Sequence, residues 1–150
     1  MASLTRTEQA VEYFLQGYSC SQAVCAAFAP SLGLDRDAAL KISGPFGGGL
    51  ARTGSVCGAL TGAMMVVGLA HGRVRADDLA TRDRSYALVQ EFMRRFKGRN
   101  SGALDCRDLL GCDLGTPEGR EQAKAMDFHH KVCPKYIRDA GEILETILRE

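Results

Sequence analysis

The feature that most constrains the fold is an uncharged run over residues 53–70. It is interrupted by four glycines: Gly54, Gly58, Gly62 and Gly68. A segment that is apolar on all sides is typical of a buried helix, and the spacing of Gly58 and Gly62 lets another backbone approach closely. The run is just long enough to raise the question of a membrane span. Its glycine, serine and threonine content instead predicts a central helix over residues 55–70 in a helical bundle, with no membrane insertion.

Helix start and stop signals divide the rest of the chain. Thr5 with Glu8, and Ser19 with Gln22, have the spacing of capping boxes. The predicted helices cover residues 5–16, 19–29, 35–42, 55–70, 77–97 and 105–110, and two more begin at 117 and 133. An apolar stripe is predicted on the long helix at Leu79, Tyr86, Val89, Phe92, Met93 and Phe96. We find no strand, repeat or linker, so the sequence predicts one all-α domain over residues 1–150, a compact bundle of about six to seven helices.

Four of the six cysteines stand where a predicted helix begins, and these are Cys20, Cys57, Cys106 and Cys133. The first turn of a helix offers unpaired N–H groups and the positive end of the helix dipole. Both stabilise a thiolate, which is the nucleophile and the metal ligand. One such cysteine is usually a small buried hydrophobe, but four together favour thiol, redox or metal chemistry. We interpret Cys25 as a core residue and leave Cys112 open.

The spacing of the cysteines excludes several known motifs. There is no CxxC, which disfavours a thioredoxin-type dithiol and a zinc ribbon, and there is no CxxCH, so covalent haem is not expected. Any site must therefore be assembled from separate helices. His129 stands four residues before Cys133, which makes a Cys/His ligand pair conceivable, although a histidine at a helix end is more often structural.

A glycine loop precedes the predicted central helix, and it contains Gly47, Gly48 and Gly49 in succession. Such a loop exposes backbone N–H groups and can wrap an anion or a cofactor, or it can simply connect crowded helices. It lacks the GxGxxG and Walker patterns, so nucleotide binding is not supported. With Gly58, these glycines are the candidate cofactor-binding residues.

Charge and the N-terminal sequence exclude other classes. The net charge of +1 gives no electrostatic case for binding nucleic acid or an anionic membrane. Residues 73–99 are locally basic, which we interpret as a solvated helix face because no nucleic-acid signature accompanies it. The N-terminus has no apolar segment of signal-peptide length, so we expect a cytoplasmic protein with reduced thiols.

The assembled segments resemble one known family. The run Cys57-Gly58-Ala59-Leu60-Thr61-Gly62 is similar to the core of the C_GCAxxG_C_C family, although the family's name puts glycine before cysteine. Its flanks agree: Tyr18-Ser19-Cys20-Ser21-Gln22, Phe46-Gly47-Gly48-Gly49, Cys106-Arg107-Asp108-Leu109-Leu110 and Cys133-Pro134-Lys135-Tyr136. The resemblance covers about residues 13–148. It implies a small helical redox-active protein with four signature cysteines, similar to the non-haem part of split-Soret-type cytochromes, where an iron–sulfur centre is suspected.

Three functional hypotheses follow. The preferred one is an electron-transfer or sensor protein whose four cysteines hold an iron–sulfur cluster, with N–H groups of the glycine loop donating to its sulfides. The second is a metal-free thiol–disulfide oxidoreductase with Cys57 as nucleophile and Cys106 or Cys133 as resolving thiol. The third is a structural zinc site or an interaction protein with inert thiols. The first two need a redox partner, which the sequence does not identify. A homodimer is compatible with the small-residue helix.

Overall fold

The computed structural model describes residues 3–150, and within them the chain forms helices and no strand. The α-helices are α1 (Arg6–Leu15), α2 (Cys20–Phe28), α3 (Arg36–Ser43), α4 (Gly58–His71), α5 (Leu79–Arg99), α6 (Cys106–Leu110), α7 (Pro117–Ala125), α8 (Phe128–Lys131) and α9 (Cys133–Arg149). Short 3-10 turns follow α2 at Ala29–Leu32 and α3 at Gly44–Phe46. The all-α prediction is confirmed, and α6 and α8 are too short to add to the main bundle.

The sequence signals at the first helix starts act as expected. The Thr5 hydroxyl accepts from the Glu8 backbone N–H, and the Glu8 carboxylate accepts from the Thr5 N–H. Ser19 and Gln22 repeat this arrangement at α2. Each box satisfies backbone donors that a helix start leaves free. Because Ser19 caps α2, Cys20 becomes the first helical residue.

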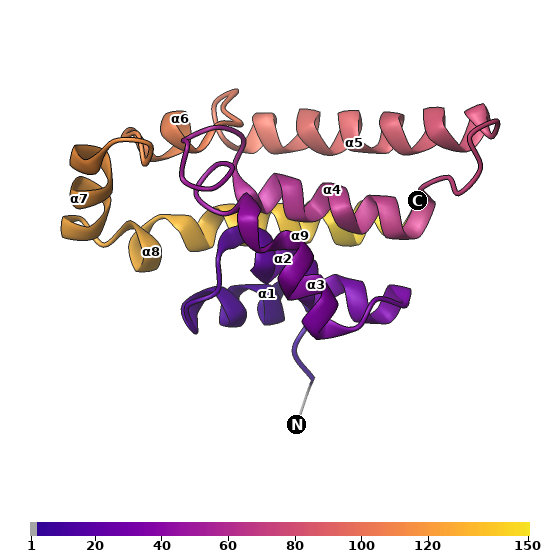
Figure 1. Ribbon diagram of the computed structural model, residues 1–150, viewed down its shortest axis with the longest axis horizontal. Helices are drawn as coiled ribbons and strands as arrows, with labels where there is room; N and C mark the ends of the chain where they lie inside the picture. Colours follow the sequence, from indigo (N-terminus) through magenta and orange to yellow (C-terminus); the bar gives the residue numbers. More distant parts are fainter. Residues whose placement is uncertain (1–2) are drawn as a thin grey trace.

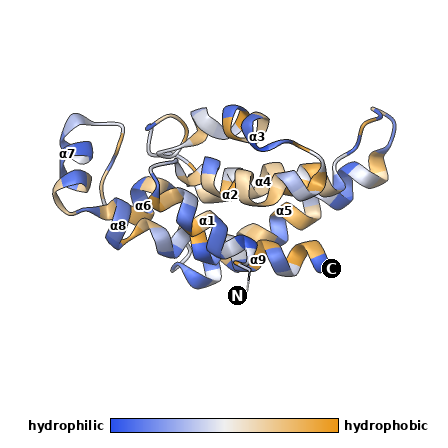
Figure 2. Cartoon of the chain, turned by 90° about the horizontal axis from the view of Figure 1, so that it is seen from below, coloured by the Kyte–Doolittle hydropathy of each residue, from blue (hydrophilic) through white to orange (hydrophobic). Residues whose placement is uncertain are grey.

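Helix α4 lies in the middle of the bundle, between α5 on one side and α1, α2 and α3 on the other, with α9 alongside (Figure 1). It begins at Gly58, three residues later than predicted, because Val56 pairs with Asp105 in an isolated antiparallel bridge. Its largest fully buried side chains are Leu60, Val66 and Val67. Figure 2 shows α4 in pale and orange tones along its length, as expected for a helix enclosed by others.

Two glycines of α4 set the distance to α2. A Cβ at Gly62 would lie 2.7 Å from the Ser21 carbonyl oxygen, and one at Gly58 would lie 2.9 Å from the Ser21 backbone nitrogen. Ser21 is fully buried at this contact, and its hydroxyl donates to the Ser43 carbonyl at 2.7 Å. The GxxxG spacing therefore serves close packing inside the bundle, as predicted.

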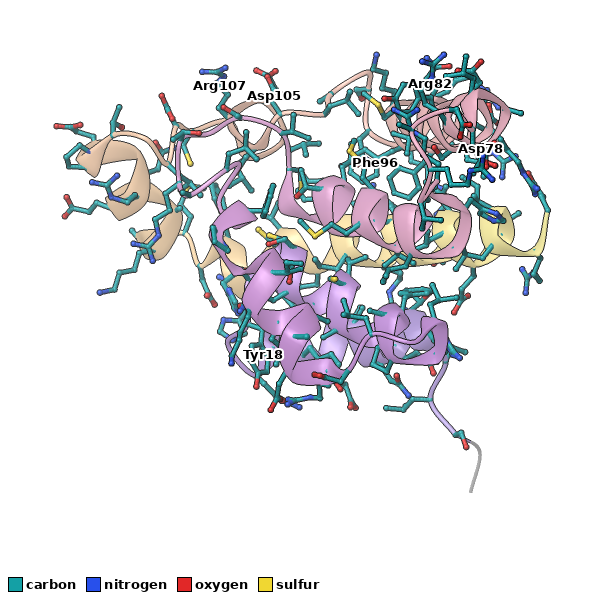
Figure 3. All side chains as sticks on the ribbon, turned by 45° about the vertical axis from the view of Figure 1, so that its right-hand side comes forward. Tyr18, Asp78, Arg82, Phe96, Asp105 and Arg107 are labelled. Carbon is teal, nitrogen blue, oxygen red and sulfur yellow. The ribbon has the colours of Figure 1, made fainter. Side chains whose placement is uncertain are left out.

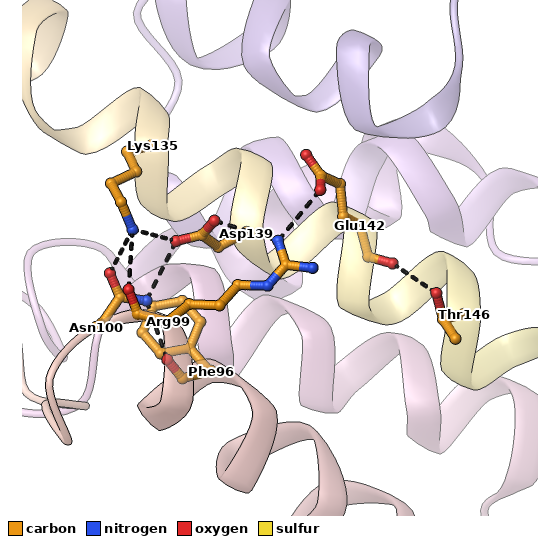
Figure 4. Close-up of polar contacts among 7 residues, drawn as sticks. All are labelled: Phe96, Arg99, Asn100, Lys135, Asp139, Glu142 and Thr146. Atoms are coloured by element: carbon orange, nitrogen blue, oxygen red, sulfur yellow. Dashed lines mark hydrogen bonds and ion pairs between the residues drawn. The ribbon is translucent and has the colours of Figure 1, made fainter.

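The C-terminal helix α9 closes the bundle with one apolar face. Figure 2 shows blue and orange residues alternating along it, and its buried apolar residues are Ile137, Ala140, Ile143, Leu144 and Ile147. At the edge of that face, the Asp139 carboxylate accepts from Lys135 Nζ at 2.6 Å and Asn100 Nδ2 at 3.2 Å, and pairs with Arg99 (Figure 4). This largely buried carboxylate joins the end of α5 to the start of α9.

The predicted stripe on α5 is correct only in its second half. Phe92 and Phe96 are buried, but Leu79 and Tyr86 are 51% and 59% exposed. Over residues 79–87 the half-buried positions are Thr81, Arg82 and Ser85, so the side of α5 that faces the bundle there is polar. None of the helices in residues 3–150 combines the length and the apolar content that a membrane crossing requires.

A pair of glycine substitutions in α4 tests the close contact with α2. We expect Gly62→Ala to lower the free energy of unfolding by about 1–3 kcal/mol, because the added Cβ meets backbone atoms that cannot move aside. Gly68 is the matched control, since a Cβ there would meet no atom within 4 Å. Gly68→Ala should raise the free energy of unfolding by about 0.5–1 kcal/mol through its helix propensity. Urea denaturation of both variants measures the difference, and equal effects would contradict the packing argument.

Candidate functional site

The four cysteines at the helix starts line one small cavity. Cys20, Cys57, Cys106 and Cys133 surround a volume of about 20 Å³, and the remaining lining residues are Gly58, Leu109, Leu110 and Tyr136. A cavity of this volume has room for about one water molecule. All six cysteines of the chain are free thiols. Figure 3 shows yellow sulfur atoms gathered near the start of α4. The structure thus brings together the four residues that the sequence analysis selected.

Cys20 reaches Cys57 because α4 begins with a glycine. A Cβ at Gly58 would lie 3.1 Å from the Cys20 Cβ, a contact tighter than nine in ten real Cβ contacts. Cys57 is the N-cap of α4, with no side-chain cap hydrogen bond, and Cys20 is the first residue of α2. The two helices therefore start side by side, with one thiol from each.

Backbone pairing brings Cys106 beside Cys57. The Cys57 N–H donates to the Leu104 carbonyl at 2.9 Å, and the Cys106 N–H donates to the Ser55 carbonyl at 2.7 Å. The bridge between Val56 and Asp105 lies between these two bonds. The Asp105 side chain points away from the bundle, into solvent (Figure 3). This antiparallel pairing, which the sequence did not reveal, fixes two cysteines that are far apart in the chain.

The glycine loop forms a left-handed turn against the cysteines. Every residue from Gly48 to Arg52 has a φ between 52° and 71°, which costs a non-glycine residue about 1–2 kcal/mol. The Gly48 N–H donates to the Cys20 sulfur. A Cβ at Gly49 would lie 2.7 Å from the Cys106 Cβ and 2.6 Å from the Ser55 nitrogen. Glycine is therefore required at Gly49 by both conformation and space.

The four candidate cofactor-binding glycines have different positions. Gly48, Gly49 and Gly58 each contact a cysteine of the cavity. Gly47 packs instead on the Ser19 cap, where a Cβ would lie 2.6 Å from the Ser19 Cβ. Gly47 thus positions α2 from outside the cavity.

Cys20 and Cys57 are paired as an acceptor and a donor. The pKa of Cys20 is lowered, chiefly because the Cys57 thiol donates a hydrogen bond to its sulfur and also because two backbone N–H groups do so. The same hydrogen bond, together with burial, raises the pKa of Cys57 well above its ordinary value. These pKa directions favour Cys20 over Cys57 as the first thiol of the pair to ionise, because burial and the neighbouring sulfur oppose the dipole at Cys57.

The other two thiols of the cavity resist ionisation. Burial raises the pKa of Cys106 to about 12, and the charge of Cys20 adds to the effect. Burial and the same neighbouring charge raise the pKa of Cys133 further still. Cys133 is the first residue of α9, where the sequence predicts that this helix begins. Four thiolates in this space would repel one another, so full ionisation requires a positive charge among them.

The remaining candidates lie outside the cavity. Cys25 is fully buried in a small cluster with Ala29 and Ala39, which agrees with its interpretation as a core residue. Cys112 is buried near the site but does not line it. His129 stacks on Phe14 at a centroid distance of 4.0 Å, and its Nε2 lies 2.8 Å from the Phe14 carbonyl oxygen. These contacts give His129 a structural role.

Three lining residues were not found from the sequence, and these are Leu109, Leu110 and Tyr136. Each follows a signature cysteine by three or four positions, which places it one helical turn further along the same face. The Tyr136 hydroxyl donates to the Leu109 carbonyl at 2.8 Å and closes the cavity between α6 and α9. The spacing of three or four residues from a signature cysteine is the sequence signal by which these lining residues could have been found.

Within the described part of the chain, the donor set of the cavity consists of four thiols and no carboxylate or imidazole. Among residues 3–150, no three His, Cys, Asp or Glu side chains are grouped so that they could hold one metal ion. Four thiols around one space are the ligand set of [2Fe–2S] and [4Fe–4S] clusters. The cavity is smaller than a cluster, so seating one requires the contact between Cys20 and Cys57 to open.

A second glycine pair tests how the loop positions the site. Gly49→Ala and Gly102→Ala both place alanine at a positive φ, but a Cβ at Gly102 meets nothing within 4 Å. We expect Gly102→Ala to cost about 1–2 kcal/mol of unfolding free energy, and Gly49→Ala to cost about 1–3 kcal/mol more because of its clash. Urea denaturation measures both values. Equal losses would show that the loop does not pack tightly against Cys106.

Comparison with known proteins places the chain in one family. Residues 18–147 match the model of a family described as putative redox-active protein (C_GCAxxG_C_C). The matched range contains all four cysteines of the cavity. No curated protein and no solved structure matches the chain. The resemblance seen in the sequence is confirmed, and the protein belongs to the C_GCAxxG_C_C family of redox-active proteins.

Proposed function

We propose that the cavity binds an iron–sulfur cluster through Cys20, Cys57, Cys106 and Cys133, and that the protein transfers or senses single electrons. The observation that carries this proposal is the convergence of four thiols, from four helix starts spread over the chain, on one space. A dithiol enzyme needs two cysteines, so a convergence of four is better explained by a four-thiolate ligand set.

The surroundings of the thiols support this role. A bound cluster supplies reversible one-electron chemistry, and its potential depends on hydrogen bonds to sulfur and on solvent exposure. Here the Gly48 N–H donates to the Cys20 sulfur, and Leu109, Leu110 and Tyr136 exclude water from one side. Iron would also provide the positive charge that four ionised thiols in a buried space require.

The ligand assignment predicts which cysteines retain iron. Anaerobically purified protein should contain iron and acid-labile sulfide and should show visible charge-transfer bands. Serine substitution of any of Cys20, Cys57, Cys106 or Cys133 should remove most of the iron, because a hydroxyl is a much poorer ligand for the cluster. Cys25→Ser and Cys112→Ser are the matched controls and should retain it, since neither residue lines the cavity.

The same metal analysis separates the alternatives. If the protein contains one zinc ion per chain and no sulfide, the structural zinc site is the correct hypothesis and the cluster is not. Protein that carries no metal after anaerobic purification and after reconstitution with iron and sulfide would overturn the proposal. Equal loss of iron in Cys112→Ser and Cys57→Ser would overturn the ligand assignment.

A specific observation also supports a second candidate, a metal-free dithiol oxidoreductase. The thiols of Cys20 and Cys57 line the same cavity at the adjacent starts of α2 and α4, and Cys20 is the more exposed of the two. In this reaction the Cys20 thiolate attacks a partner disulfide and releases one partner thiol. Cys57 then attacks the Cys20 sulfur, which forms the Cys20–Cys57 disulfide and releases the second partner thiol. Two electrons thus pass to the partner. The more exposed Cys20 is the nucleophile and Cys57 is the resolving thiol, whereas the sequence analysis gave the role of nucleophile to Cys57.

The dithiol candidate makes a prediction about labelling. In metal-free protein, a limiting amount of iodoacetamide should modify Cys20 before Cys57, because Cys20 is partly exposed and Cys57 is buried. Peptide mass mapping identifies the modified residue. Mild oxidation of the same protein should produce the Cys20–Cys57 disulfide and protect both thiols. Modification of Cys57 before Cys20, or oxidation that links neither, would exclude this mechanism.

A further inference from the structure

A second, larger cavity lies directly beside the cysteine site. It has a volume of about 510 Å³, within the range of small-molecule sites. Cys20 and Cys133 line both cavities, so an occupant of the larger one would lie against two of the four cysteines. Helices α7 and α8, which extend beyond one end of the bundle in Figure 1, contribute its outer wall.

Part of this outer cavity is apolar and aromatic. Its apolar lining residues include Phe14, Leu110, Leu114 and Phe128. Phe14 is held in place by His129, which stacks on it at 4.0 Å with 21° between the ring planes. Flat apolar walls of this kind favour a planar aromatic group over a flexible chain.

The cavity also carries two cations with no acidic partner. Arg52 and Lys124 line it, and neither belongs to any of the ion pairs formed by residues 3–150. The acidic residue of the lining is Asp127, and its carboxylate is engaged by His130 Nδ1 at 2.8 Å. The lining therefore has a net positive charge that is available to an anion.

The backbone holds Arg52 in place at considerable cost. Arg52 is the last residue of the left-handed turn, with a φ of 63°, and its N–H donates to the Gly47 carbonyl at 3.0 Å. Non-glycine residues in this conformation are rare and occur preferentially at functional sites. The turn that supplies the Gly48 N–H to Cys20 thus also places a guanidinium at the outer cavity.

We propose that the outer cavity binds a planar aromatic redox molecule that carries an anionic group, the class of flavin nucleotides and sulfonated quinones. Its ring would lie against the apolar wall beside Cys20 and Cys133, and its anionic group would lie at Arg52 and Lys124. The proposal rests on the proposed function, because it names the class of molecule that would exchange electrons with the site. Binding of that molecule in the outer cavity does not itself require a cluster.

Flavin mononucleotide and riboflavin are suitable probes, because they share one ring system and differ in the phosphate. Fluorescence titration should show that flavin mononucleotide binds about tenfold more tightly than riboflavin, since two cations face the phosphate. Arg52→Gln and Lys124→Gln should each weaken binding of flavin mononucleotide about threefold and leave riboflavin unchanged. Arg84→Gln is the matched control, because it removes the same charge from an exposed position on α5.

A steric variant tests the location independently of charge. Ala123 lines the cavity and is half-buried, so Ala123→Phe should fill it and abolish binding of both flavins. Circular dichroism verifies that this variant folds. The titrations are made on the protein as purified and again after iron removal, with anthraquinone-2-sulfonate as a second probe of the class.

The outcomes are distinguishable from those for the cluster. Binding that depends on Arg52, Lys124 and Ala123 in protein without iron would support the outer cavity even if the metal analysis had overturned the cluster. Equal affinities for the two flavins, or an equal effect of Arg84→Gln and Arg52→Gln, would overturn the proposal. No binding of either flavin mononucleotide or the sulfonated quinone at millimolar concentration would also overturn it, whatever the iron content.

Discussion

The site depends first on the approach of α2 to α4 at Gly58 and Gly62. With no Cβ at these positions, the backbone of Ser21 lies directly against α4, and the starts of both helices meet. A bulkier residue would separate them and withdraw Cys20 from Cys57. Gly58 and Gly62 are therefore needed to form the site, although glycine has no functional group that could take part in its chemistry.

The second constraint is the stretch between α3 and α4, where the chain bears conformational strain. Consecutive residues with positive φ, among them Leu50, Ala51 and Arg52, persist only where the surroundings leave no alternative. Those surroundings are the antiparallel pairing of Cys57 with Leu104 and of Cys106 with Ser55. One irregular segment thus positions the Gly48 N–H at one cysteine, leaves space for another and places a cation at the outer cavity.

Much of the fold could be read from local signals. The capping boxes at Thr5 and Ser19 act through residues three positions apart, so the starts of α1 and α2 were predictable. A buried helix is recognised by its lack of charged residues, so α4 was predictable too. The choice of cysteines was predictable for the same reason, because helix starts are local features. The exposed Leu79 and Tyr86 were not, since whether an apolar residue is covered depends on how far the neighbouring helices extend.

Contacts between segments far apart in the chain could not be predicted from the sequence. The bridge of Val56 with Asp105 joins segments with no pairing signal, and it delayed the start of α4. The donor and acceptor roles of Cys57 and Cys20 depend on burial and on a neighbour from another helix, neither of which is encoded in the surrounding residues. Local reasoning therefore identified the thiols of the site but not the order in which they ionise.

The wide separation of the four cysteines along the chain has a mechanical consequence. They stand in α2, before α4, in α6 and in α9, so most of the sequence lies between the first and the last of them. Any group bound to all four would act as a crosslink between the two halves of the molecule. It would restrict the unfolded chain as several disulfides do, and the loaded protein would unfold much more slowly than the empty one.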